Sequence, residues 1–211
     1  MYTHSPIRLL VVEDNFLARI ALRGAFEALG NAQIVAETPF GQDALRLYRE
    51  HQPDVVLMDL RLRGSSGIHA IQEIHRSYPN SKILVLSHCQ GSEDVYRAMQ
   101  AGARGYLTKE AEGRQLTEAL QVVATGGRYI PASLESLLAE RIPTANVTPR
   151  EQMVLELLAK GMSTSDIAKR IDIAEKTVRI HISNLLDKLG ARDRTHALVL
   201  ALKRGIIHLD M

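Results

Sequence analysis

Five short apolar runs, separated by amphipathic stretches, are the feature that most constrains the fold of this chain. The runs carry Val, Ile and Leu at consecutive positions, as strands do when both of their faces are buried. This alternation predicts a doubly wound α/β fold of five βα units, with a parallel sheet and helices on both faces. The expected strands are 7–12, 33–36, 54–58, 82–86 and 104–107, and the expected helices are 15–29, 41–51, 67–77, 92–101 and 112–125.

The last third of the chain shows helix signals only. Thr148 and Glu151 have the spacing of a capping box, with a proline at the first helical position. Ser163 and Asp166 repeat that spacing for a second, short helix, and glycines follow the expected helix ends. A third helix is expected from about 174 to 189 and a fourth from 193 to 204. The pattern predicts an all-α domain of four helices that contains a helix-turn-helix.

A stretch with Gly126-Gly127 and two prolines separates these regions, and it includes a possible short helix at 133–141. We therefore expect a first domain at 1–125, a linker at 126–146 and a second domain at 147–211.

Composition narrows the function classes. No apolar run approaches the roughly 20 residues of a membrane helix, so we expect no membrane contact. A single cysteine, Cys89, cannot form an internal disulfide, which favours a reducing, cytoplasmic setting. Residues 144–211 hold 11 basic against 8 acidic side chains, and residues 1–143 hold 15 against 16. This mild asymmetry permits nucleic-acid binding by the second domain.

Polar side chains stand at the carboxyl ends of the expected strands. Glu13 and Asp14 follow the first strand, Asp59 the third, Ser87 the fourth and Lys109 the fifth. Because these ends meet at one edge of a parallel sheet, the five side chains should converge. Clustered carboxylates suit Mg²⁺, a hydroxyl and a lysine suit phosphoryl oxygens, and a carboxylate can itself be a nucleophile. Solvated polar groups at strand ends are the alternative for each residue taken singly.

The motifs VVEDN, DVVLMDLRLRG, KILVLS and AGARGYLTKEA occur in order, and residues 7–125 resemble the receiver domain of bacterial two-component response regulators. The resemblance implies that Asp59 takes a phosphoryl group from a histidine kinase. It also implies that Mg²⁺ is held by Asp14, Asp59 and the backbone carbonyl of Arg61, with Glu13 acting mainly through water.

In the same resemblance Ser87 and Lys109 contact the phosphoryl group. Tyr106 resembles the switch aromatic of the family, which changes rotamer as the loop at Ser87 moves inward. An edge tyrosine without a switching role is the alternative for Tyr106.

Three positions depart from the common receiver pattern. Arg63 stands where a proline usually shapes the loop after the phosphoacceptor, so that loop should be looser. His88 follows Ser87, where many receivers have a smaller residue, and Glu110 replaces a frequent proline. These changes bear on the rate of phosphorylation.

The third helix of the second domain can be divided into two faces. The residues that should face the core are Val178, Ile182, Leu185, Leu186 and Leu189. The opposite face carries Lys176, Arg179, Ile180, Ser183 and Asp187. A basic first half with a small serine fits a recognition helix in the major groove of double-stranded DNA. An ordinary solvated face is the alternative.

Individual residues of this helix can be given roles. Arg179 can donate to guanine and Ile180 can contact a thymine methyl group. Thr177, Asn184 and Lys188 are better placed for phosphates, which position a protein without specifying sequence.

Residues 147–205 resemble the LuxR-type DNA-binding domain over a nearly continuous match that begins VTPREQMVLELLAKG and ends RDRTHAL. With the receiver, this resemblance implies a response regulator of the NarL/FixJ class, a cytoplasmic and non-enzymatic transcription regulator that binds promoter DNA as a homodimer. Ala174 departs from the family, which generally has a serine there to cap the recognition helix. In relatives the helix corresponding to 193–204 helps to pair two DNA-binding domains, whereas packing within its own domain is the alternative.

Two other functions are compatible with parts of the pattern. A phosphatase of the haloacid-dehalogenase type also uses an aspartate nucleophile and Mg²⁺, but that class needs an aspartate where Arg61 stands. A regulator whose receiver works without phosphorylation is the second alternative. The predicted function is a phosphorylation-controlled transcription regulator.

Overall fold

The computed structural model describes residues 5–139 and 147–208. The chain divides into two compact units, of which one holds residues 1–89 and 95–135 and the other holds 90–94 and 136–211.

The first unit is built on a five-stranded parallel sheet with the strand order β2-β1-β3-β6-β7. The strands are β1 Ile7–Val12, β2 Ala32–Thr38, β3 Val55–Met58, β6 Ile83–Ser87 and β7 Gly105–Thr108. All five predicted strands are present, with ends that differ by no more than two residues from expectation. Strands β1, β3 and β6 are central, and all four residues of β3 are buried. A strand covered on both faces needs apolar side chains at every position, which explains the continuous apolar runs.

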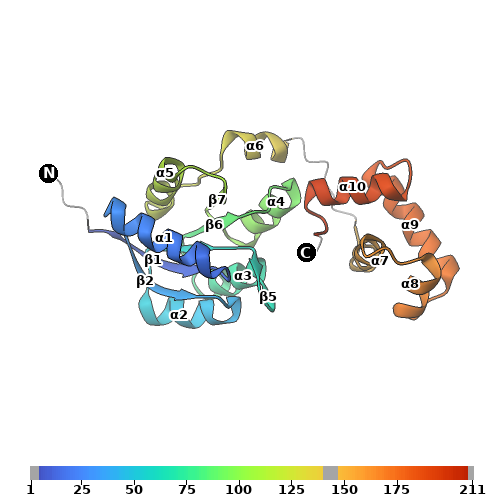
Figure 1. Cartoon of the computed structure of the whole chain (residues 1–211), viewed down its shortest axis with the longest axis horizontal. Coiled ribbons are helices and arrows are strands. Elements are labelled where there is room, and N and C mark those ends of the chain that lie inside the picture. Colours follow the sequence, from blue (N-terminus) through green and yellow to red (C-terminus); the bar gives the residue numbers. More distant parts are fainter. Residues whose placement is uncertain (1–4, 140–146, 209–211) are drawn as a thin grey trace. The chain divides into compact units, whose positions relative to one another are not determined.

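Helices follow the strands as predicted: α1 Phe16–Leu29, α2 Ala44–His51, α3 Gly67–Ser77, α4 Ser92–Ala101 and α5 Gly113–Ala124. A short 3-10 turn, Gly41–Asp43, precedes α2. Side chains of α1 and α5 share one apolar cluster with alternate residues of the strands, among them Leu9, Leu57 and Leu84. Helix α2 lies on the opposite side of the sheet from α5 (Figure 1).

A hairpin that the sequence pattern did not predict follows β3. Its strands, β4 Arg61–Leu62 and β5 Ser65–Ser66, pair antiparallel around a two-residue turn. Gly64 in that turn has a φ of +75°, a conformation that glycine adopts without a steric penalty. Leu62 is buried and anchors the hairpin next to the carboxyl end of β3. The loop after the aspartate therefore forms a two-stranded hairpin, and its greater looseness stays a prediction.

The segment after α5 also contributes to the sheet. Tyr129 forms a parallel bridge with Gly105, and its carbonyl accepts a hydrogen bond from the backbone N–H of Tyr106 at 2.9 Å. Helix α6 Ala132–Ala139 lies near the expected 133–141, of which residues 140 and 141 are outside the described part. Residues 128–130 were predicted to be linker, and here they are held against β7.

The second unit contains the four predicted helices: α7 Pro149–Ala159, α8 Thr164–Arg170, α9 Glu175–Leu189 and α10 Arg194–Arg204. The predicted capping box is present, because the Thr148 hydroxyl accepts from the N–H of Glu151 and the Glu151 carboxylate accepts from the N–H of Thr148. Ser163 and Asp193 cap α8 and α10. Residues from all four helices form one apolar core around Val178, Leu185 and Ala201.

Within residues 5–139 and 147–208, no helix combines the length and the apolar character needed to cross a bilayer.

Candidate functional site

The loop after β1 presents the first two carboxylates. The N–H of Glu13 donates to the carbonyl of Thr38 at 3.0 Å, which extends the sheet up to the acidic residues. Asn15 then caps α1, since its side-chain oxygen accepts from the N–H of Ala18. The N–H of Asn15 donates to the Glu13 carboxylate at 3.0 Å. The start of α1 therefore fixes the buried Glu13, while Asp14 stays partly accessible.

Asp59 lies at the carboxyl end of the central strand β3. Its N–H donates to the carbonyl of Val12 at 2.9 Å, so strand pairing continues as far as the aspartate. One carboxylate oxygen accepts from the Ser87 hydroxyl at 2.7 Å and from the N–H of Arg61 at 3.1 Å. The other accepts from the Lys109 ammonium at 2.6 Å. Asp59 is thus held by donors from β6, from β4 and from the residue after β7.

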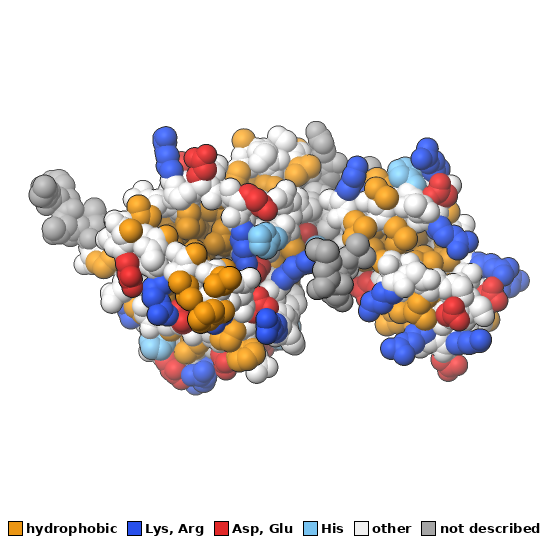
Figure 2. Space-filling model, in the orientation of Figure 1, with side chains coloured by type: hydrophobic (Ala, Val, Ile, Leu, Met, Phe, Trp, Pro, Cys, Tyr) orange, Lys and Arg blue, Asp and Glu red, His pale blue; other side chains and the backbone are white. Residues whose placement is uncertain are grey.

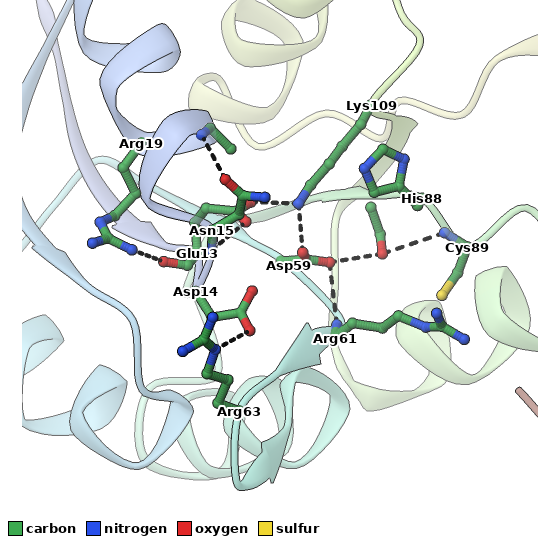
Figure 3. Close-up of polar contacts among 12 residues, drawn as sticks. Glu13, Asp14, Asn15, Arg19, Asp59, Arg61, Arg63, His88, Cys89 and Lys109 are labelled. Atoms are coloured by element: carbon green, nitrogen blue, oxygen red, sulfur yellow. Dashed lines mark hydrogen bonds and ion pairs between the residues drawn. The ribbon is translucent and has the colours of Figure 1, made fainter. Parts of the chain in front are cut away.

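Lys109 joins two of the three carboxylates. Its ammonium lies 2.6 Å from an oxygen of Glu13 and 2.6 Å from an oxygen of Asp59 (Figure 3). The backbone places it there, because the N–H of Lys109 donates to the carbonyl of Ser87 at 3.0 Å. The five residues predicted to converge at this edge of the sheet are therefore close together.

Burial and charge act in opposite directions on these groups. Burial raises the pKa of Glu13, and the nearby Asp59 adds to this, although the hydrogen bond with Lys109 works against it. Burial alone would lower the pKa of Lys109, but its hydrogen bonds to Asp59 and Glu13 outweigh that effect, so the pKa is raised. Lys109 is therefore charged at neutral pH and lies next to the buried carboxylates of Glu13 and Asp59.

The donor set of the cluster fits a hard divalent cation. Glu13, Asp14 and Asp59 each offer one carboxylate oxygen, and these three oxygens lie within 4.8 Å of one another. An all-oxygen set of this size is what Mg²⁺ prefers, and one lysine does not neutralise three carboxylates.

Tyr106 points into the protein and is fully buried. Its hydroxyl donates to the backbone carbonyl of Cys89 at 2.7 Å. The N–H of Cys89 in turn donates to the Ser87 hydroxyl at 3.4 Å. The predicted switch residue therefore contacts the loop that carries Ser87, two residues beyond it.

Several residues around the site were not found by sequence reasoning. Arg19 donates from α1 to the backbone carbonyl of Glu13 at 2.7 Å, a contact between residues six positions apart that no pattern signals. Gly67 begins α3, where a Cβ atom would overlap the carbonyl oxygen of Asp59. Glycine at a helix start is a detectable signal, but the atom it approaches is known only from the fold.

The three residues that differ from the common receiver pattern, Arg63, His88 and Glu110, lie at the rim of the site. The guanidinium of Arg63 lies 3.6 Å from the Asp14 carboxylate. The imidazole of His88 lies 3.5 Å from the Glu110 carboxylate, and both side chains are exposed. His88 and Glu110 therefore pair with each other at the surface, above the buried cluster.

Helix α9 divides as predicted into a core face and an exposed face. Val178, Leu185 and Leu189 are buried, and Ile182 and Leu186 pack against the same core. The side chains predicted for the opposite face, Lys176, Arg179, Ile180, Ser183 and Asp187, are all exposed. Asn184 is exposed as well, whereas Thr177 is half-buried. Lys and Arg side chains lie over α8 and α9, with Asp and Glu side chains among them (Figure 2). Only the basic members of this mixed surface suit the phosphate backbone of a duplex.

Lys188 has a partner inside its own domain. Its ammonium lies 2.7 Å from the carboxylate of Glu151, whose side chain is only 3% exposed. Burial raises the pKa of Glu151, but hydrogen bonds from Lys188 and Thr148 outweigh it, so the pKa is lowered. This pair fastens α9 to α7 and gives Lys188 a structural role that the sequence did not indicate. A phosphate contact by Lys188 stays a prediction.

The first turn of α9 shows two further features. Ala174 occupies the N-cap with an extended backbone, and its methyl group cannot accept a hydrogen bond. The Arg179 guanidinium lies 2.6 Å from the Glu175 carboxylate one turn earlier, and both side chains are well exposed. In this structure the arginine predicted to read a base is paired within its own helix.

Two family models match the chain. Residues 9–121 match the response regulator receiver domain, and residues 145–201 match the bacterial regulatory proteins of the luxR family. The nitrate/nitrite response regulator protein NarP of Escherichia coli is 34% identical, over 95% of this chain and 96% of NarP. The transcriptional regulatory protein DegU of Brevibacillus brevis is 33% identical, over 95% of each chain.

Solved structures give the same result. A LuxR-family response regulator from Aurantimonas is 34% identical with a TM-score of 0.61, and the match covers 64% of this chain and 97% of the other. The response regulator ChrA of a heme-sensing two-component system is 27% identical with a TM-score of 0.58, over 97% of this chain and all of ChrA. Because the relatives are transcription regulators, the phosphatase alternative is set aside. The chain belongs to the NarL/FixJ family of two-component response regulators and is a DNA-binding transcription regulator.

Proposed function

We propose that Asp59 is the phosphoacceptor through which a histidine kinase controls promoter binding by this regulator. The observation that supports it most is the pair of hydrogen bonds to Asp59, from the Ser87 hydroxyl on one oxygen and from the Lys109 ammonium on the other. These two donors are of the kind that bind phosphoryl oxygens.

The proposed transfer is a displacement at phosphorus. A carboxylate oxygen of Asp59 forms a bond to the phosphorus while the bond from phosphorus to the kinase imidazole breaks. The imidazole leaves with the bonding electron pair and takes a proton from solvent. Lys109 and Ser87 then donate to oxygens of the new phosphoryl group, so that charge developing on it is stabilised.

Mg²⁺ fits the acidic cluster, and the receiver family generally uses it. We propose that Asp14, Asp59 and the backbone carbonyl of Arg61 hold it, with Glu13 contributing through water. When bound, it supplies positive charge against the phosphoryl oxygens. The hydrogen bond between Lys109 and Glu13 keeps the ammonium next to Asp59 in the same cluster.

We further propose that Tyr106 and Ser87 transmit the modification. When the Ser87 hydroxyl donates to a phosphoryl oxygen instead of to Asp59, the loop from Ser87 to Cys89 moves with it. The Tyr106 hydroxyl donates a hydrogen bond to this loop, at the carbonyl of Cys89. The rotamer of Tyr106 and the nearby surface then change, which favours homodimers on DNA.

For the second unit we propose that α9 enters the major groove. Arg179, Ile180 and Ser183 face base edges, and Lys176, Thr177, Asn184 and Lys188 approach phosphates. We propose a receiver domain at 1–125, a linker at 126–146 and a DNA-binding domain at 147–211, with the first part of the linker bound to β7 through Tyr129. With promoter DNA as the partner, we propose a cytoplasmic location.

Intact mass after incubation with acetyl phosphate and Mg²⁺ tests the acceptor. We expect one phosphoryl adduct on the wild type and on Asp54→Asn, but none on Asp59→Asn. Asp54 is a matched control, because it is an exposed aspartate next to the opposite end of the same strand. An adduct on Asp59→Asn would show that another residue is the acceptor.

DNA affinity with and without the acyl phosphate tests the consequence. We expect phosphorylation to raise specific affinity in the wild type and to leave Asp59→Asn unchanged. Equal affinity of the phosphorylated and unphosphorylated wild type would favour the regulator that works without phosphorylation.

A further inference from the structure

We infer that Arg63 is an additional residue of the acidic site, where its guanidinium competes with the divalent cation for Asp14. The inference rests on the proposed Mg²⁺ site and adds the side chain of Arg63 to it. Arg63 stands where receivers commonly have a proline, which carries no charge.

The hairpin after β3 determines where Arg63 lies. Leu62 is buried, and Gly64 with its positive φ closes the turn, so the residue between them stands at the tip. The Arg63 side chain is 81% exposed, yet its Nε atom lies 3.6 Å from Oδ2 of Asp14. The arginine extends from the hairpin toward the loop after β1 (Figure 3).

The charges of the cluster are divided between two cations. Lys109 forms ion pairs with Glu13 and Asp59, and Arg63 forms one with Asp14. Each carboxylate that would surround the metal therefore already has a cationic partner. Asp14 is the most accessible of the three, and its Oδ2 is the oxygen next to the guanidinium, so an ion that binds this oxygen displaces Arg63.

The size of the effect follows from the exposure of the pair. A solvent-exposed ion pair changes an equilibrium by a small factor, so loss of the Arg63 side chain should tighten divalent-cation binding about two- to fivefold. The difference should nearly vanish at about 1 M salt, where the screening length is about 3 Å. It should also be independent of pH between about 6 and 9, because guanidinium does not lose its proton there.

Binding of Mn²⁺ to the full-length protein, followed by the electron paramagnetic resonance of the free ion, measures this directly. We expect Arg63→Ala to bind two- to fivefold more tightly than wild type, and Arg63→Lys to lie between them. Arg76→Ala is the matched control, because Arg76 is 79% exposed and lies 3.8 Å from Glu73 on α3. It removes the same charge and should bind as wild type does.

A second readout follows Arg63 itself. The ¹H–¹⁵N signal of its Nε–H, assigned by its absence from Arg63→Ala, should shift when Mg²⁺ is added. In Asp14→Asn without metal, the signal should already lie near the position that the wild type reaches with Mg²⁺. A signal that Mg²⁺ leaves in place would overturn the competition.

The outcomes separate this inference from the proposed function. Equal Mn²⁺ affinity of wild type and Arg63→Ala overturns the role of Arg63 and leaves the metal site intact. An equal gain in Arg63→Ala and Arg76→Ala also overturns it, since net charge alone would then explain the change. Failure of wild type and Arg63→Ala to bind Mn²⁺ contradicts the metal site and the inference together.

Discussion

Replacing Lys188 with methionine tests whether this lysine stabilises the second unit through its ion pair with Glu151. Methionine keeps much of the aliphatic length and removes the charge that faces Glu151. Two short hydrogen bonds, of 2.7 and 2.9 Å, would disappear. The carboxylate would then be buried with the donors of Thr148, at 2.8 and 3.0 Å, but without its cation.

The magnitude follows from the burial of the two partners. Breaking a fully buried ion pair from one side destabilises a protein by about 3–5 kcal/mol. The Lys188 side chain is 28% exposed, and Thr148 still donates to the carboxylate, so we expect a loss below that range, about 2–3 kcal/mol. For a domain of this size, that lowers the melting temperature by on the order of 10–20 °C.

Two measurements on the full-length protein separate this structural role from phosphate binding. Urea titration followed by amide signals of core residues such as Leu185 and Ala201 reports the unfolding free energy of the second unit. The salt dependence of affinity for a duplex of random sequence reports phosphate binding, since the slope falls by about one for every phosphate-bound lysine that is removed.

Lys176→Met on the same helix is the matched control. Lys176 is exposed, so its replacement should change stability by less than about 0.5 kcal/mol and reduce the salt slope. Lys188→Met should also reduce the salt slope, because we propose that Lys188 approaches a phosphate, but unlike Lys176→Met it should in addition lower the unfolding free energy by about 2–3 kcal/mol. An unfolding free energy within about 0.5 kcal/mol of wild type, together with a reduced salt slope, would refute the structural role of Lys188.

Three further predictions concern other positions. Ala174→Ser should stabilise the second unit by about 1 kcal/mol in the same urea assay, because the extended N-cap backbone is ready for a hydroxyl acceptor; no gain would mean that the cap is already satisfied. Gly67→Ala should slow phosphorylation by acetyl phosphate, because its Cβ would overlap the carbonyl oxygen of Asp59, whereas Gly24→Ala, with nothing within 4 Å, should not. The pKa of Glu151 is lower in the folded state than its ordinary value of 4.5. The ionised carboxylate therefore stabilises the fold when the pH is above 4.5, and this stabilisation is lost as the pH falls below 4.5. In Glu151→Gln the unfolding free energy of the second unit should fall less than in the wild type as the pH is lowered below 4.5. An equal fall in both proteins would contradict this contribution of Glu151.

The strands were predictable because the central sheet needs apolar side chains at consecutive positions. Ile7–Val12 is both the predicted and the observed range of β1. The hairpin at 61–66 was not predictable by the same reasoning, since each of its strands has two residues and its sequence is mostly polar. Leu62 is buried, but one buried leucine does not give a period that a sequence pattern can show.

For the site, the rule that strand ends meet was enough to bring five residues together. It did not predict that Lys109 forms ion pairs with both Glu13 and Asp59, each at 2.6 Å. In α9 the helical period separated core residues from exposed ones. It could not identify the partner of Lys188, because Glu151 is 37 positions away in the sequence and the pairing is tertiary.

The strand β7 is an edge strand, and the backbone of Tyr129 covers part of its free side. Exposed strand edges are templates for pairing with other chains, and proteins protect them with covering segments. An isolated receiver truncated at residue 125 would lack this cover and expose the donors of β7, which invites aggregation in a fragment whose fold is otherwise complete. A fragment extended past Pro131 would keep the edge closed, so the boundary suited to expressing the domain lies beyond the end of its last sheet-packing helix.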